Sequence, residues 1–213
     1  MIIGIDATQS FTQYGMLSSK GIDYRRIDNH DRIEDLPLLF NELITTSDDS
    51  IQSVLTIIGP GSYTGIRLSL TSAKMLAKVH QASIRWVPLF DAYMHVISPL
   101  VQSLCIVTSN SRKGFLNVQL FQSNQDGVAP VSSLLQQTDA QFMAFLNKFE
   151  AAIGWHHIGD QCRFAFDLPD TVQKIAADLA LDKVLAVVNS DPNLWASENN
   201  SSNQLIYSAP AVV

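Results

Sequence analysis

The feature of this sequence that most constrains its fold is a glycine-containing loop between two regular elements. Residues 51–58 form an apolar run rich in β-branched side chains, which predicts a buried central strand. The loop at residues 59–62 follows directly, and apolar residues then recur at helical spacing from Thr64, the expected N-cap, to Val79. A buried strand that turns at once into a helix is typical of α/β proteins, in which helices cover the faces of a sheet.

The elements expected around this loop form two series of similar order. Each series begins with strands joined by tight connections, which are typical of an antiparallel meander. In the first half we expect strands over residues 1–7, 11–18, 21–27, 51–58 and 82–87 and helices over 32–46, 64–79 and 91–97. In the second half we expect strands over 104–108, 116–121 and 151–158, helices over 140–149 and 171–181, and an irregular tail over 189–204. This repetition predicts a duplicated α/β unit with lobes at residues 1–99 and 100–213.

The composition excludes several classes of protein. Hydrophobic residues make up 46% of the chain and charged residues only 16%, against a usual charged share of about 25%, so disorder is excluded. The net charge of −6 provides no broad basic surface for nucleic acid. Two cysteines exclude a disulfide framework and a four-thiolate zinc site. Without a recognisable secretory signal or membrane span, we expect a reduced, cytoplasmic protein.

A glycine-rich loop that leads into a helix can hold an anion, because glycine permits close backbone approach and the helix N-terminus supplies free N–H groups. The candidates for such a cradle are Asp6, Gly59, Gly61, Ser62, Thr64 and Arg67. Their spacing departs from that of the P-loop, the dinucleotide-binding fingerprint and the serine-hydrolase elbow. From the residues alone, a tight turn is the favoured interpretation, in which Gly61 adopts a backbone conformation that is costly for other residues.

The remaining polar residues indicate no catalytic set. Asp6 ends the first strand, where it can either face a ligand or close an Asx-turn, and both interpretations stay open. The five histidines show no metal-ligand spacing. Adjacent His156 and His157 are expected to point one inward and one outward from a strand, and Cys162 is expected to be a small packed thiol. Residue patterns alone therefore predict no catalytic residue, no metal ligand and no cofactor.

The loop and its flanks are similar to a known family. Residues 59–67 read GPGSYTGIR and precede an alanine-containing helix with Lys74, while residues 3–8 read IGIDAT. These motifs resemble the TsaB (YeaZ) family, which takes part in threonylcarbamoyladenosine synthesis on tRNA. Residues His30, Leu36-Pro37 and Leu43-Ile44 are similar to that family's first helix. The resemblance covers residues 1–98.

The resemblance implies an α/β fold of two tandem ribonuclease-H-like lobes, the architecture of actin, Hsp70 and sugar kinases. The second lobe departs from the family pattern at Asn110, Phe115 and Asn117, and its terminal Ile206-Tyr207-Ser208 lacks the usual arginine. These departures indicate a divergent member of the family.

The resemblance also implies that the chain is not itself the catalyst. TsaD, the catalytic relative, carries an H-x-x-x-H metal motif, and its two histidines fall on Leu89 and Tyr93 of this chain. A leucine and a tyrosine do not replace two imidazoles at an iron or zinc site. No metal site is therefore expected.

The implied function is that of a scaffold subunit. Such a subunit binds a TsaD-like catalytic protein and, through that complex, a TsaE-like ATPase, and it supports N6-threonylcarbamoylation of adenosine 37 in tRNA. The partner would carry the tRNA-binding surface, and a homodimer is the other assembly considered. The alternative is an enzyme: a small-molecule kinase or ATPase that uses Asp6 and the Gly59 loop, or, as a weaker variant, a glycoprotease-like hydrolase.

The helix expected over residues 64–79 carries two apolar stripes, whereas an ordinary surface helix needs only one. The first stripe, suited to packing on the sheet, consists of Ile66, Leu70, Ala73 and Ala77, and a polar stripe of Arg67, Thr71, Lys74 and Lys78 runs beside it. The pattern leaves open whether the second stripe packs within the chain or against a partner. The resemblance favours a partner, because the first two helices of TsaB pair with TsaD. The partner-binding candidates are Leu68, Ser72, Met75, Val79, Leu36, Leu39 and Leu43.

Overall fold

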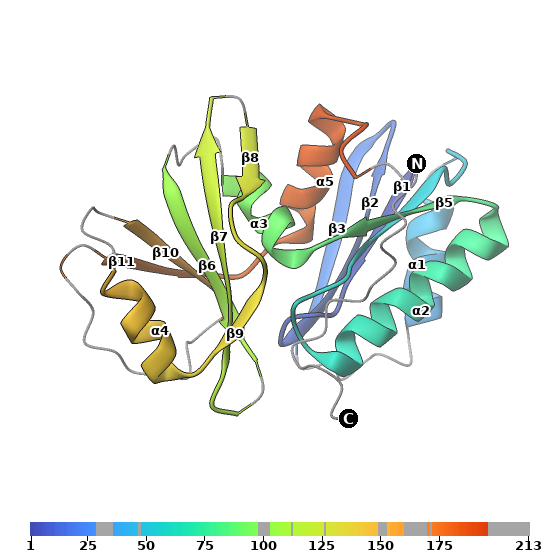
Figure 1. Ribbon diagram of the computed structural model, residues 1–213. Helices are drawn as coiled ribbons and strands as arrows, with labels where there is room; N and C mark the ends of the chain where they lie inside the picture. The colour runs from blue at the N-terminus through green and yellow to red at the C-terminus, as the bar shows by residue number, and fades with distance from the viewer. Residues whose placement is uncertain are drawn as a thin grey trace. The chain divides into compact units, whose positions relative to one another are not determined.

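The computed structural model describes residues 1–28, 36–46, 48–97, 103–111, 113–125, 127–148, 153–159, 170 and 172–195. The chain forms two compact units, each built on one sheet (Figure 1). The first unit contains Met1–Leu89 and the segment that begins at Ala180, and the second contains Phe90–Leu179. These bounds differ from the lobes expected at 1–99 and 100–213, because the chain beyond Ala180 returns to the first sheet.

The first sheet contains five strands in the order β3-β2-β1-β4-β5. They are β1 (Ile2–Asp6), β2 (Phe11–Ser18), β3 (Gly21–Asp28), β4 (Ser53–Ile57) and β5 (Ser83–Val87). Strands β1, β2 and β3 are antiparallel neighbours, whereas β4 and β5 run parallel to β1. The expected meander is confirmed, and so is the buried central strand, because every residue of β4 is buried.

One face of the first sheet is covered by α1 (Leu36–Thr45) and α2 (Tyr63–His80). Both helices contribute to one apolar core together with β1, β2 and β4. Its buried members include Ile3, Ile5, Tyr14, Met16, Phe40, Leu43, Val54, Ala73, Leu76 and Ala77. Pro37 lies in the first turn of α1, where proline is tolerated because the first N–H groups of a helix have no intrahelical partner.

The other face is covered by α5 (Leu181–Ser190). Side chains alternate between the faces of a strand, so Gly4, between two isoleucines that face α1 and α2, faces α5. A Cβ atom on Gly4 would lie 3.3 Å from the Leu181 side chain. Gly4 is paired with Gly15 on β2, and the lack of side chains at this pair lets the helix pack close to the sheet.

The second sheet has the order β11-β10-β6-β7-β8, and β9 pairs with β7. Its strands are β6 (Leu104–Asn110), β7 (Leu116–Asn124), β8 (Gly127–Pro130), β9 (Leu135–Gln137), β10 (Ile153–Ile158) and β11 (Val172–Ala177). Two helices belong to this unit almost entirely, α3 (Leu89–Ile97) and α4 (Asp139–Leu146). None of the helices in the described ranges is both long enough and apolar enough to cross a membrane.

The two sheets are built on one plan. In each, a central strand has an antiparallel neighbour followed by a second antiparallel strand on one side, and two parallel strands on the other. The order β8-β7-β6-β10-β11 therefore repeats β3-β2-β1-β4-β5. This is the duplicated α/β architecture of two tandem ribonuclease-H-like lobes, and the predicted fold class is confirmed.

The end of the second lobe differs from the sequence-based expectation. The helix predicted over 171–181 is wrong: Val172–Ala177 is strand β11, which pairs in parallel with β10. The helix begins at Leu181 instead, and its residues Leu181, Val184, Leu185 and Val188 form the buried face. Strands β8 and β9 were also not predicted. The predicted tail beyond residue 195, together with His30 and Cys162, lies outside the described residues.

Both histidines of β10 are buried, so the expectation that one points outward is wrong. The Tyr93 hydroxyl of α3 lies 3.2 Å from His156 Nδ1. On the opposite face, Trp155 packs edge-on against Phe142 of α4, and His157 Nδ1 lies 2.9 Å from Thr108 Oγ1. Because helices cover both faces of the strand, both side-chain directions lead into the protein.

The burial of His156 predicts a stability that falls in acid. Burial lowers the pKa of this imidazole below its ordinary value, so the unfolded chain takes up the proton at a higher pH than the folded protein. Stability is therefore complete above about pH 6.5, the unfolded value, and is lost as the pH falls below it. We expect His156→Gln to lose less stability than the wild type between pH 7.5 and 5.5 in urea unfolding. His80→Gln, at the exposed end of α2, is the control, and an equal loss in both variants would contradict the assignment.

Candidate functional site

The glycine loop packs against the turn that follows β1. Ser62 N–H donates to the Thr8 carbonyl at 2.9 Å. A Cβ atom on Gly61 would lie 2.5 Å from that same oxygen, and one on Gly65 would lie 1.6 Å from the Ala7 oxygen. Glycine is thus required at residues 61 and 65, because the backbone of Ala7 and Thr8 occupies the space that a side chain would need.

The reason for glycine in this loop differs from the one expected. The left-handed backbone conformation occurs at Gly59, whose φ is 97°, and not at Gly61. Gly61 is required instead by its close approach to Thr8. The N-cap of α2 is Ser62 rather than Thr64, since the Ser62 hydroxyl accepts a hydrogen bond from Gly65 N–H at 3.2 Å.

Asp6 is buried and bonded within the chain. Its side chain is 1% exposed. Oδ1 accepts from the Thr8 N–H at 2.8 Å and from the Thr8 hydroxyl at 2.6 Å. Oδ2 accepts from the Gln9 amide at 2.8 Å and from the Gln13 amide at 3.1 Å. Of the two interpretations left open, the closed Asx-turn is the one observed.

Burial raises the pKa of the Asp6 carboxyl above its ordinary value, although the hydrogen bonds from Thr8, Gln9 and Gln13 lower it. The network continues beyond the carboxylate. Gln13 Oε1 accepts from the Leu181 N–H at the start of α5 and from the Tyr24 hydroxyl, each at 2.9 Å. Asp6 and the glycine loop are therefore brought together, because both contact the turn that follows β1.

The positions that match the metal-binding histidines of TsaD, Leu89 and Tyr93, lie on α3. Leu89 is 1% exposed, and its N–H donates to the Gly59 carbonyl at 2.6 Å. Burial, with a smaller contribution from Cys105, raises the pKa of Tyr93 to about 12. In the described ranges, no group of three His, Cys, Asp or Glu side chains is arranged to hold a metal ion.

The predicted partner-binding residues differ in how far they are exposed. Met75 is 45% exposed and Val79 is 70% exposed, whereas Leu68 and Ser72 are half-buried. The assignment of Leu43 to a partner surface is wrong, because it is 3% exposed and packs in the core beneath α1. The side chains of Leu36 and Leu39 lie outside the described residues.

Two exposed apolar residues near these positions were not among the candidates. Leu38 of α1 is 67% exposed and Tyr63 of α2 is 55% exposed. Leu38 follows Pro37 at the start of α1, where a helical pattern does not separate the buried face from the exposed one. Tyr63 Oη accepts from Arg67 one turn later at 3.3 Å.

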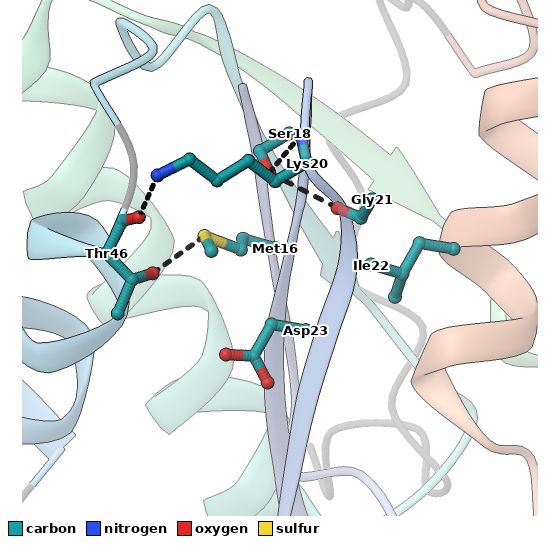
Figure 2. Close-up of a pocket in the computed structure, with 7 residues that line it drawn as sticks. All are labelled: Met16, Ser18, Lys20, Gly21, Ile22, Asp23 and Thr46. Carbon is teal, nitrogen blue, oxygen red and sulfur yellow. Dashed lines mark hydrogen bonds between the residues drawn. The ribbon is translucent and has the colours of Figure 1, made fainter.

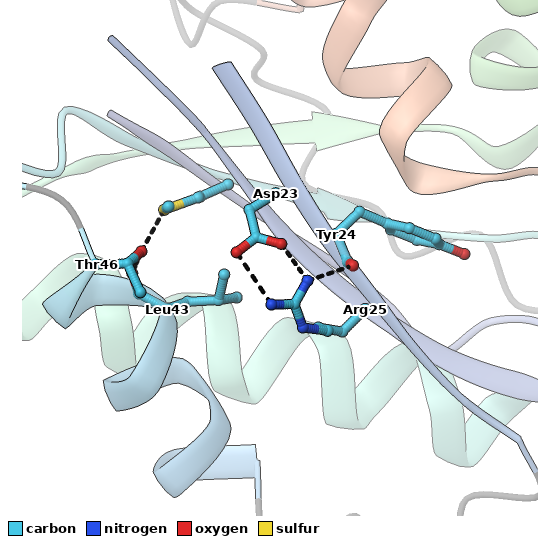
Figure 3. Close-up of polar contacts among 6 residues, drawn as sticks. Asp23, Tyr24, Arg25, Leu43 and Thr46 are labelled. Carbon is cyan, nitrogen blue, oxygen red and sulfur yellow. Dashed lines mark hydrogen bonds and ion pairs between the residues drawn. The ribbon is translucent and has the colours of Figure 1, made fainter. Parts of the chain in front are cut away.

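An open cavity of about 220 Å³ lies beside the turn between β2 and β3 (Figure 2). Lys20 is part of its wall, and the ammonium donates to the Thr46 carbonyl at 2.8 Å. Asp23 is the other charged residue of the wall, and it pairs with Arg25 (Figure 3). Since both charges are engaged within the protein, no ligand chemistry is assigned to this cavity.

Solved structures that share the fold of this chain include two YeaZ-like proteins. No protein-family model matches the sequence, and no curated protein matches it. A crystal structure of an uncharacterized protein with similarity to peptidase YEAZ from Pseudomonas aeruginosa has a TM-score of 0.71 at 11% identity, covering 96% of this chain and 96% of that chain. YeaZ from Pseudomonas aeruginosa has a TM-score of 0.69 at 14% identity, covering 89% of this chain and 90% of that chain. The chain therefore has a YeaZ-like fold.

The contact of the glycine loop with the Ala7–Thr8 backbone predicts intolerance to any side chain. Alanine in a helix is ordinarily about 1 kcal/mol more favourable than glycine, yet Gly65→Ala places Cβ inside the Ala7 carbonyl. We expect Gly65→Ala and Gly61→Val each to lower the free energy of unfolding by at least about 3 kcal/mol. Thr64→Ala, at an exposed position in the same turn, is the control. Unchanged thermal melting of both glycine variants would refute this packing.

The four donors directed at Asp6 predict a cost for replacing the carboxylate by an amide. Asparagine would place N–H groups against the Gln9 or Gln13 amide, and Gln13 is held in its orientation by Leu181 and Tyr24. We expect Asp6→Asn to destabilise the protein by about 1–3 kcal/mol, the cost of buried donors without acceptors. Asp28→Asn, whose side chain is 70% exposed, should change stability by less than about 0.5 kcal/mol. Equal effects in chemical denaturation would contradict the buried network.

Proposed function

We propose that this chain is a non-catalytic subunit that binds a TsaD-like protein through the exposed face of α2, and thereby supports threonylcarbamoylation of adenosine 37 in tRNA. The observation that carries the proposal is the exposure of Met75 and Val79 on a helix whose opposite face is already buried on the sheet. Packing on the sheet requires only one apolar stripe of a surface helix, so packing within this lobe does not account for the second stripe.

The stripe is suited to a protein contact. Leu68, at the N-terminal end of the stripe, packs partly against the core. This contact helps to fix the position of the helix that carries the exposed residues. Met75 follows two turns later, and a methionine side chain adapts readily to the shape of a partner surface. Val79 extends the stripe by one further turn.

The scaffold role is also supported by the contacts of the residues that were candidates for holding a phosphate. Asp6 accepts four hydrogen bonds from within the chain, and Gly61 and Gly65 contact the protein's own backbone. A kinase or ATPase of this architecture would need these groups at the nucleotide. Leu89 and Tyr93 likewise offer no imidazole to a metal ion.

The larger assembly follows from the proposed partner. The TsaD-like subunit would perform the transfer and hold the tRNA, and a TsaE-like ATPase would join through that complex. The net charge of −6 suits a subunit that does not itself hold the nucleic acid. In this role the protein would act in the cytoplasm.

The test is a substitution within the exposed stripe. We expect Met75→Lys to fold normally but to weaken association with the co-expressed TsaD-like protein by at least about 2 kcal/mol, the scale of an interface hot spot. Ile175→Lys is the matched control, because Ile175 is 40% exposed against 45% for Met75 but lies on β11 of the second unit. Circular dichroism reports folding, and size-exclusion chromatography with calorimetry reports association.

Four results would count against the proposal. Unfolding of Met75→Lys would place Met75 in the core, and normal binding by this variant would place the interface elsewhere. Micromolar binding of ATP–Mg with turnover by the isolated protein would favour the kinase alternative. A full equivalent of zinc or iron in untagged protein would revive the hydrolase alternative.

A further inference from the structure

The exposed face of α2 carries charge of only one sign. The helix spans 18 residues and contains no aspartate or glutamate, although the chain as a whole has 20 acidic and 14 basic residues. Its cations, Arg67, Lys74 and Lys78, are all exposed. The most prominent helix of the proposed interface is therefore basic on an acidic protein.

These cations form no ion pair with the residues that the structure describes. Among the residues that the structure describes, ion pairs join Arg25 to Asp23, Arg26 to Asp28 and Lys183 to Asp182, and none involves α2. Arg67 interacts with its own helix instead, donating to the Tyr63 hydroxyl and lying 5.5 Å from the centre of that ring. Lys74 and Lys78 have no acidic partner in this part of the chain.

The cationic stripe directly borders the apolar one. Lys74 and Lys78 are four residues apart, so they lie on one side of the helix. Met75 and Val79 each follow one of these lysines in the sequence and are turned by about 100° from it. A surface that covers Met75 and Val79 must therefore approach both lysines.

We propose that the protein surface bound by α2 is acidic, with carboxylates facing Arg67, Lys74 and Lys78 around an apolar centre that covers Met75 and Val79. This inference rests on the proposed function for the identity of the partner, and adds the chemistry of the surface that it presents. Charge complementarity supports it, because opposite charges across an interface raise the association rate and reject wrong partners. A neutral or basic surface would leave three cations partly desolvated without a counter-charge.

The same pattern disfavours a second copy of this chain on α2. A two-fold symmetric interface brings the same surface patch of both subunits together. Two copies of α2 would then oppose their cations, and no acidic residue of the helix could relieve the repulsion. The occupant assigned to this face is therefore a different protein.

The apolar residues of this face favour a protein over a nucleic acid as the bound partner. A phosphate backbone would engage the cations but would leave Met75 and Val79 without a contact of their own. An acidic protein surface with an apolar centre uses both stripes. RNA bound at α2 is accordingly an outcome that the test must detect.

The first experiment uses the co-expressed TsaD-like protein and a charge-reversal variant. We expect Lys74→Glu/Lys78→Glu to weaken association at least about tenfold in 50 mM salt, and we expect wild-type association to weaken as salt rises to 500 mM. Lys113→Glu/Lys148→Glu makes the same change in net charge at exposed positions of the second unit, and should bind as the wild type does. Association that is insensitive to salt and to Lys74→Glu/Lys78→Glu, yet lost in Met75→Lys, would overturn the acidic surface and leave the proposed function standing.

A second experiment does not depend on the identity of the partner. Two synthetic amphipathic helical peptides share one apolar stripe, flanked by glutamates in one peptide and by lysines in the other. We expect the Met75 methyl resonance to report binding of the glutamate peptide at least about tenfold tighter than that of the lysine peptide, and Lys74→Glu/Lys78→Glu to reverse the preference. If the TsaD-like protein fails to bind while this preference holds, only the proposed function is lost.

Several results overturn the inference directly. Equal binding of the two peptides, or binding of neither, would show that the charges do not select an acidic surface. A wild-type homodimer that Met75→Lys dissociates would assign the face to a second copy. Binding of a labelled transfer RNA that Lys74→Glu/Lys78→Glu abolishes and Met75→Lys leaves unchanged would assign it to nucleic acid.

Discussion

The first lobe depends on a buried carboxylate at the end of its central strand. Asp6 cannot be left without partners in the core, because an unpaired buried charge is far more costly than most packing defects. Its four hydrogen bonds close the turn after β1, and Gln13 extends the same network to the first residue of α5. A segment that returns from the far end of the chain is thus joined to the first strand by polar contacts as well as by apolar packing.

The glycine loop depends on the turn that Asp6 closes. Only glycine fits at residues 61 and 65, because the Ala7–Thr8 backbone occupies the space in front of them. The Gly59 carbonyl in turn accepts a hydrogen bond from the N–H of Leu89, the first residue of α3. Asp6 and the glycine loop are therefore joined through the turn at Ala7–Thr8. The outer face of α2, where Met75 and Val79 are exposed, takes no part in this network.

The parts of the structure that were predicted correctly depend on neighbours in the sequence. The strand before the glycine loop and the helix after it follow from unbroken apolar patterns. The helix predicted over residues 171–181 followed from apolar residues at helical spacing, Val172, Ile175, Ala176 and Leu179. Parallel pairing with β10 makes Val172–Ala177 a strand, and no local preference in that segment indicates this pairing.

The sequence by itself determined the duplicated α/β plan, the resemblance of residues 59–67 to a family motif and the presence of two apolar stripes on α2, because spacing along the chain carries these properties. Only the tertiary structure decided that Gly61 is required by a backbone contact, that Asp6 closes a turn and that Leu43 is core while Met75 is exposed. The Gly61 contact and the burial of Asp6 and Leu43 each depend on residues brought near by folding. The position of a residue in a helix or strand determines the face on which its side chain lies. Which other element covers that face depends on residues that are distant in the sequence.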